Sequence, residues 1–85
     1  MQDAREKVLH FVVCIENSEY PVSLELHKIY RTLPDEKTAE DGDLRVIDES
    51  GEDYIYPASY FLPIRLSRET EQALATSFSR LQKTV

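Results

Sequence analysis

The feature that most constrains this fold is an apolar, β-branched segment near the N-terminus. Residues 8–15 read Val-Leu-His-Phe-Val-Val-Cys-Ile, and only His10 interrupts the apolar run. A run of this length is typical of a strand that is buried on both faces of a sheet, whereas a membrane-spanning helix needs about 20 apolar residues. A chain of 85 residues can build only one hydrophobic core. We therefore expect a single domain organised around this central strand.

Four further strands are predicted from short apolar segments that turn residues separate. They cover about residues 26–33, 44–48, 54–56 and 62–66. The start of the first one stays open between helix and strand, because the apolar spacing in residues 23–29 also fits a short helix. Pro63 cannot donate a backbone hydrogen bond, so it indicates an edge position for the last strand.

Turn chemistry fills the intervals between these strands. Residues 34–43 are polar and are expected to form a surface loop. Residues 49–53 are expected to form a hairpin turn, in which Gly51 can supply the positive φ that such turns require. Pro57 should end the strand before it, and residues 58–61 should form one tight helical turn.

The C-terminal segment has the periodicity of a helix. Ser67 is a good N-cap, and acidic residues follow it in the first turn. The apolar stripe recurs at helical spacing and consists of Leu74, Phe78, Leu81 and Val85. We expect a helix over about residues 68–83, which packs on the β core or pairs with another chain. Residues 1–66 would then form the β part, and residues 67–85 the helix, of the same single domain.

Two segments resemble parts of SH3 domains. Residues 40–48, Glu-Asp-Gly-Asp-Leu-Arg-Val-Ile-Asp, resemble the SH3 segment in which an acidic-glycine turn leads into a core strand. Residues 56–61, Tyr-Pro-Ala-Ser-Tyr-Phe, are similar to the turn before the last SH3 strand. The resemblance implies a mainly β fold, a small antiparallel SH3-like barrel with a C-terminal amphipathic α-helix. Residues 33–35 and 45–54 also resemble a group of short bacterial proteins of unassigned function.

The departures from SH3 domains bear on function. Peptide-binding SH3 domains hold a proline-rich helix with a tryptophan and an Ala-Leu-Tyr-x-Tyr segment, and this chain contains no tryptophan. The interval from Asp48 to Tyr56 is also too short for the two middle strands of a standard SH3 domain. The resemblance carries over only Pro57 and Tyr60. It implies that Tyr60 faces a binding surface with its hydroxyl available to a ligand.

Net charge separates the classes of partner. The chain has 10 Lys and Arg against 16 Asp and Glu, a net charge of -6, and no basic cluster. Binding to nucleic acid or to an anionic membrane relies on basic side chains, so we expect neither. Negative charge favours a basic protein partner instead, although it also keeps a small protein soluble. The N-terminus lacks the order of a secretion signal, and a single cysteine cannot form an internal disulfide, so a cytoplasmic location is expected.

No pattern in the sequence predicts catalysis, a metal site or a cofactor. Cys14 lies inside an apolar strand, which favours a buried thiol over a reactive one. His10 falls on the same strand face and is expected to be half-buried and structural, and His27 lies too far away in the chain to complete a zinc site. The acidic residues 41–53 do not have the spacing of a calcium loop. We therefore expect no enzymatic activity.

The tyrosines are the remaining candidates for function. Tyrosine suits interfaces because it buries a large apolar body and keeps a polar tip. Tyr54 and Tyr56 share a strand face, and Pro57 and Tyr60 follow within a turn. These four residues predict a face with acidic turns at its rim that binds a protein partner. The alternative hypothesis is that the tyrosines close the core and that the chain forms a homodimer through its C-terminal helix.

Overall fold

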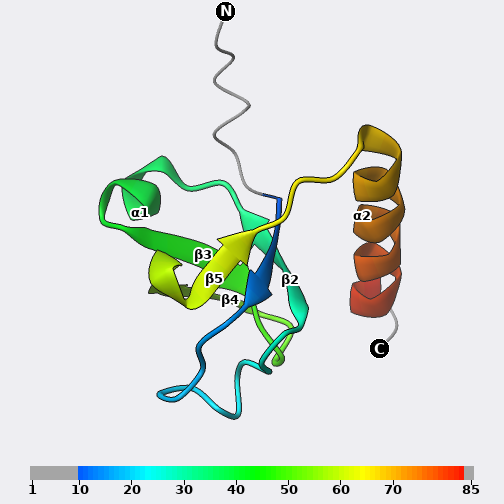
Figure 1. Ribbon diagram of the computed structural model, residues 1–85. Helices are drawn as coiled ribbons and strands as arrows, with labels where there is room; N and C mark the ends of the chain where they lie inside the picture. The colour runs from blue at the N-terminus through cyan, green and yellow to red at the C-terminus, as the bar shows by residue number, and fades with distance from the viewer. Residues whose placement is uncertain (1–9, 84–85) are drawn as a thin grey trace, which may run out of the picture.

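The computed structural model describes the backbone of residues 10–83 and the side chains of residues 10–80. At its centre is one five-stranded antiparallel sheet in the order β4-β3-β2-β1-β5. The strands are β1 (Phe11–Cys14), β2 (Ile29–Leu33), β3 (Asp43–Ile47), β4 (Asp53–Pro57) and β5 (Phe61–Pro63). Figure 1 shows this sheet with helix α2 (Arg68–Lys83) standing beside it. The predicted mainly β fold with a C-terminal helix is thus confirmed.

The two edges of the sheet are β4 and β5. Each pairs with one neighbour, β4 with β3 and β5 with β1. No β4–β5 pairing closes the sheet in the described part of the chain, so the structure is an open sheet rather than a demonstrated barrel. The predicted edge position of Pro63 is confirmed, but β5 covers residues 61–63 and not 62–66, because the chain leaves the sheet after this proline.

The hydrophobic core lies on one face of the sheet, where alternate residues of each strand point. Its buried members are Val12, Cys14, Leu24, Tyr30, Val46, Tyr56 and Phe61. Burial of both faces of β1 is also confirmed, because Phe11 is only 2 % exposed although it points to the opposite face. The described part of β1 therefore is the central strand that the apolar run predicted, while residues 8 and 9 lie outside the described residues.

Strand β2 begins at Ile29, three residues later than predicted. Residues 26–28 are outside the ladder because His27 has a φ of 66°. The N–H of His27 donates to the carbonyl of Cys14 at 2.7 Å, and the N–H of Cys14 donates to the carbonyl of Lys28 at 3.0 Å. Two residues thus oppose one, which is a β-bulge whose first residue is left-handed. The short helix that residues 23–29 also allowed does not form.

The expectation of a loop over residues 34–43 was wrong in its middle, where helix α1 (Glu36–Glu40) forms. The carboxylate of Asp35 accepts a hydrogen bond from the N–H of Thr38 at 3.1 Å and caps the first turn. The same carboxylate accepts from Arg45 of β3 at 2.8 Å. An N-cap and a tie to the sheet are therefore sufficient to fold one turn of helix in a polar segment.

The hairpin between β3 and β4 forms as predicted, with Gly51 at a φ of 86°. Asp48 stabilises this turn because its carboxylate accepts from both the N–H and the hydroxyl of Ser50, at 2.9 and 2.6 Å. The ladder ends at Pro57, and a single 3₁₀ turn, η2 (Ala58–Tyr60), leads into β5. This turn is the tight helical turn that the sequence predicted.

Helix α2 has the predicted bounds and the predicted cap, since the Ser67 hydroxyl accepts from the N–H of Thr70 at 3.1 Å. Its apolar stripe packs on the sheet where the Phe78 and Phe11 rings lie 5.6 Å apart. Glu71 lies 2.8 Å from the imidazole of His10, whose side chain is 48 % exposed just before the start of β1 and so about half-buried, as expected. The side chain of Leu81 and all of Val85 lie outside the described residues. Neither described helix is long and apolar enough to cross a membrane.

Candidate functional site

The structure separates the four predicted binding residues by burial. Tyr54 is 57 % exposed on β4, whereas Tyr56 is 3 % exposed and belongs to the core. Pro57 and Tyr60 are half-buried at the turn that follows. Tyr54 and Tyr56 do share a strand face, since their Cα partners on β3 are Val46 and Leu44. Only part of the predicted face is therefore available to a partner directly.

Tyr56 is a buried residue of the core that lies beneath the exposed part of the predicted binding face. Its ring is buried, and its hydroxyl donates to the carboxylate of Asp48 at 2.6 Å. Burial, followed by this bond to Asp48, raises the pKa of Tyr56 to about 12. The hydroxyl therefore stays protonated at neutral pH and acts as a fixed donor rather than as an acid or a base.

Tyr20, which was not among the predicted site residues, completes the aromatic cluster. Its ring stands edge-on to the Tyr56 ring at 5.0 Å and lies 6.1 Å from the Tyr60 ring. Tyr20 comes from the loop between β1 and β2 and is 39 % exposed. We call the exposed surfaces of Tyr20 and Tyr60 the tyrosine face. Tyr20 was missed because nothing local in its sequence indicates that its loop folds back onto β4.

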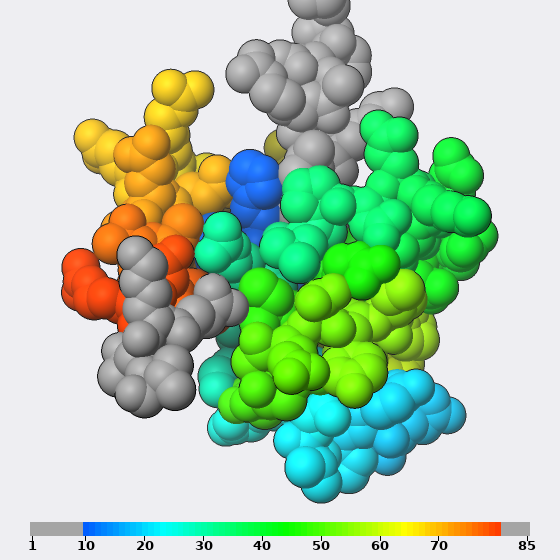
Figure 2. Space-filling view, turned by 180° about the vertical axis from the view of Figure 1, so that it is seen from behind, coloured from blue at the N-terminus to red at the C-terminus, as the bar shows by residue number. Residues whose placement is uncertain are grey.

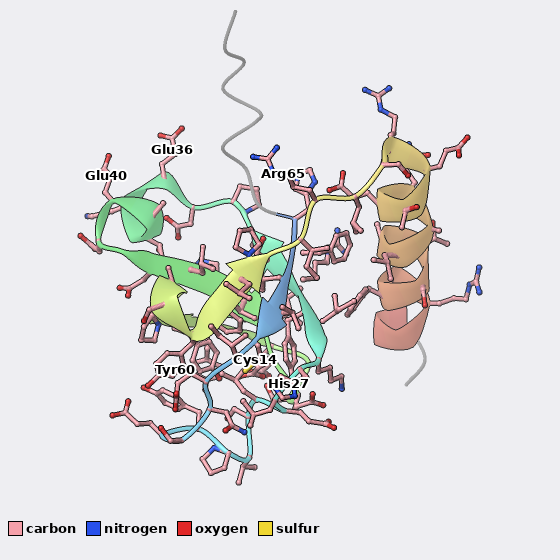
Figure 3. The ribbon with its side chains drawn as sticks, in the orientation of Figure 1. Cys14, His27, Glu36, Glu40, Tyr60 and Arg65 are labelled. Atoms are coloured by element: carbon pink, nitrogen blue, oxygen red, sulfur yellow. The ribbon has the colours of Figure 1, made fainter. Side chains whose placement is uncertain are left out.

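Tyr60 points away from Glu36 and Glu40 of α1 and toward the β1–β2 loop, as the labelled side chains in Figure 3 show. The sequence implied that its hydroxyl is available to a ligand, but this hydroxyl donates to the carboxylate of Glu19 at 2.8 Å. The bond to Glu19 raises the pKa of Tyr60 to about 12. A second bond, from the Ile15 N–H to the Tyr60 carbonyl at 2.8 Å, ties η2 to the start of the same loop.

The loop of residues 15–28 also exposes aliphatic side chains beside the tyrosine face. Val22 is 89 % exposed, and Leu26 and Ile15 are 44 % and 41 % exposed. Val22 and Leu26 line one hollow, and neighbouring exposed apolar side chains of this kind are typical of interaction surfaces. An open hollow of about 540 Å³ lies in this loop, and its lining includes Asn17, Pro21, Val22, Leu24, Glu25, Leu26 and Glu49.

Carboxylates surround these apolar groups. The Ser18 hydroxyl and N–H hydrogen-bond to Glu16 and lower its pKa. Glu49 also has a lowered pKa, chiefly because Lys28 lies 2.7 Å away and then because the Tyr30 hydroxyl donates to it. Both groups are ionised at neutral pH. Because the charge of Glu49 is paired with that of Lys28, the negative charge at the rim of the loop comes from Glu16 rather than from Glu49.

The other candidate groups have structural surroundings. Burial raises the pKa of the Cys14 thiol, which donates to the carbonyl of Glu16 at 3.4 Å. A protonated, enclosed thiol is a poor nucleophile. Within the described residues, no three side chains of the metal-ligating types come together. The site with the clearest shape and charge is thus the tyrosine face with its acidic loop.

Comparisons with known proteins add no name to this arrangement. No family model matches the chain, and neither a curated protein nor a solved structure does so. A functional assignment therefore depends on the geometry of the chain's own residues.

Proposed function

We propose that this protein is a small interaction module that binds a basic protein partner through the tyrosine face. The observation that carries the proposal is the packing of the Tyr20 ring edge-on against the buried Tyr56 ring and beside the Tyr60 ring. This arrangement holds two partly exposed rings in place before a partner arrives, so little side-chain entropy would be lost on binding. Preorganised tyrosines of this kind are typical energetic centres of protein interfaces.

The surroundings of the rings support a protein as the partner. Val22 and Leu26 add exposed apolar surface in the same loop, and the hollow beside them is open rather than enclosed. Small-molecule sites bury most of their ligand in a cleft, whereas a protein partner needs a broad surface with a polar rim. The loop offers the second of these arrangements.

The charge at the rim supports a basic partner. Glu16 and Glu19 both precede Tyr20 in the same loop, and the carboxylate of Glu19 accepts a hydrogen bond from the Tyr60 hydroxyl. A negative rim accelerates encounter with a positively charged surface and adds selectivity, and salt weakens both effects. Binding should therefore weaken as ionic strength rises.

We also propose that the sheet is of SH3-like type, which the turn Pro57–Tyr60 directly before the last strand supports. In this proposal Tyr60 contacts the partner, Tyr54 extends the surface along β4, and Tyr56 acts by positioning Tyr20. Pro57 ends the ladder so that η2 can present Tyr60. The expected cytoplasmic location stays a prediction.

An affinity capture from the native host's lysate tests the proposal. Wild type should retain a basic protein that the folded variant Tyr20→Ala/Tyr60→Ala does not retain. Glu16→Gln/Glu19→Gln should weaken the capture, while Glu36→Gln/Glu40→Gln, with the same charge change on α1 and away from Tyr60 (Figure 3), should not. Equal capture by the wild type and by the tyrosine variant would show that the partner does not bind through the tyrosine face.

The alternative function, self-association through α2, has a separate test. Phe78 packs on the Phe11 ring within the chain, and Phe11 is only 2 % exposed. Deleting residues 68–85 should therefore destabilise the β part. Loss of a dimer with the β part still folded would instead favour the dimerisation helix.

A further inference from the structure

The outer edge of β4 is a second surface on which a partner can act. β4 pairs with β3 and with no other strand in the described residues. The unpaired side of an edge strand presents main-chain donors and acceptors that can hydrogen-bond another extended segment. Which residues present them depends on the phase of the β3–β4 ladder.

Two hydrogen bonds at the ends of the ladder determine this phase. At the hairpin end, the N–H of Asp48 donates to the carbonyl of Glu52 at 3.1 Å. At the other end, the N–H of Ala58 donates to the carbonyl of Gly42 at 3.0 Å. In an antiparallel pair, hydrogen-bonded and non-hydrogen-bonded residue pairs alternate, and both end bonds give the same alternation.

The alternation determines which backbone N–H and C=O groups of β4 point toward β3 and which point away from the sheet. Tyr54 and Tyr56 fall in hydrogen-bonded pairs, so their N–H and C=O groups point toward β3. Asp53, Ile55 and Pro57 fall in non-hydrogen-bonded pairs, and their backbone groups point away from the sheet. The free edge of β4 is therefore formed by these three residues.

Ile55 has both backbone groups available at this edge. The N–H of Asp53 is bonded by its own carboxylate, and Pro57 has no N–H. Within residues 10–83, no turn or loop bond reaches the backbone of Ile55. The opposite edge, β5, is only three residues long and contains Pro63, which makes it a poorer template.

The side chains on β4 leave this edge accessible. Ile55 is 49 % exposed on one face of the strand, and Tyr54 is 57 % exposed on the other. Native edges are commonly protected by lysine or by inward-pointing charge, and the one charged residue of β4, Asp53, is paired with Arg45 at 2.7 Å. An added strand would thus meet apolar side chains on both faces.

Charge selects the occupant of this edge. Glu52 lies at the hairpin end of β4, and Asp41 and Asp43 lie at the other end, where Asp43 is the Cα partner of Pro57. A second copy of this chain, with its net charge of -6, would bring like charge to these ends. A segment with basic residues is complementary to both ends.

We propose that the edge of β4 binds an extended, basic segment of the partner as a sixth strand, held by the N–H and C=O of Ile55. The basic character of the partner rests on the proposed function. Figure 2 shows the β3–β4 hairpin (green to yellow-green) on the surface directly beside the β1–β2 loop (blue to cyan). Because Tyr20 of that loop packs on Tyr56 of β4, one partner can contact the tyrosine face and the edge together.

A blocked seven-residue peptide of alternating lysine and valine is the probe. Amide hydrogen exchange and NMR titration of the full chain should show protection of the Ile55 N–H as this peptide is added. Ile55→Pro removes the outward N–H and leaves the ladder bonds of β4 in place, so it should weaken peptide binding about tenfold. Ile55→Val keeps the N–H and should bind like the wild type. A lysine–proline peptide of equal charge should not protect Ile55.

Three results would overturn the edge proposal. One is equal peptide binding by Ile55→Pro, in a variant whose Tyr54 and Tyr56 amides remain protected. Another is protection of Ile55 that rises with protein concentration alone, which would make a second copy the occupant. The third is an unprotected Ile55 at saturating peptide. If the tyrosine variants still lose the captured partner in that case, the proposed function stands and only the edge is excluded.

Discussion

The substitution Tyr56→Phe tests how the tyrosine face is supported. It deletes the hydroxyl that donates to Asp48 at 2.6 Å and keeps the ring on which Tyr20 packs. A hydrogen bond to a charged acceptor contributes about 1.5–3 kcal/mol. Asp48 keeps its two bonds from Ser50, so it is not left without partners. We therefore expect a loss of about 2 kcal/mol in the free energy of unfolding, a large fraction of the total for a small domain.

Urea unfolding followed by far-ultraviolet circular dichroism measures this loss. The midpoint should fall while the dependence of the free energy on urea stays unchanged, because the folded surface is the same. Tyr54→Phe is the matched control, and it should change stability by less than about 0.5 kcal/mol because Tyr54 is 57 % exposed. Equal, small losses in both variants would refute the reasoning, because Tyr56 would then not depend on its bond to Asp48. Partner capture should survive Tyr56→Phe.

Three further predictions concern single contacts. His27→Gly should raise the free energy of unfolding by about 1 kcal/mol, and the thermal midpoint with it, because glycine adopts the φ of 66° without steric cost. A lower midpoint would contradict this. The Thr38 N–H and then Arg45 lower the pKa of Asp35 to about 2, so its contribution to stability is present above about pH 4 and lost as the pH falls toward 2. A carboxyl NMR titration should show this pKa rising in Arg45→Met, and an unchanged value would exclude the ion pair as a cause. Ser67→Ala should cost about 1 kcal/mol and speed amide exchange at the start of α2; unchanged exchange would mean that the cap is not effective.

The sequence predicted the fold best where the signal was local. The apolar run of β1, the Gly51 turn and the Ser67 cap each specify their element within a few residues, and all three elements form. Helix α1 was missed because its five residues, four of them polar, carry no apolar periodicity. The cap signal was nevertheless present, since Asp35 precedes Glu36 and Thr38. The late start of β2 depends on His27 accepting a left-handed conformation, which residue type alone does not indicate.

The candidate site was less predictable because it depends on contacts between distant segments. Tyr20 and Tyr56 lie far apart in the chain and meet only because the β1–β2 loop folds over the end of the sheet. The bond from the Glu49 N–H to the Ser23 carbonyl, at 3.0 Å, belongs to the same long-range packing. The amino-acid composition indicated tyrosine as the residue type suited to an interface. It could not indicate which tyrosines are buried in the core and which lie on the surface. No local pattern distinguishes the buried Tyr56 from the exposed Tyr54 two residues earlier.

The most direct test of the central claim is an NMR map of the captured basic partner on the isotope-labelled chain. The account predicts that the amide shifts and line broadening concentrate on residues 16–26 and on η2, with Ile55 of β4 as the next site. Residues of α1 and of the solvent-exposed side of α2 should not change. Shifts that concentrate on α2 would contradict the tyrosine face and would favour association through the helix.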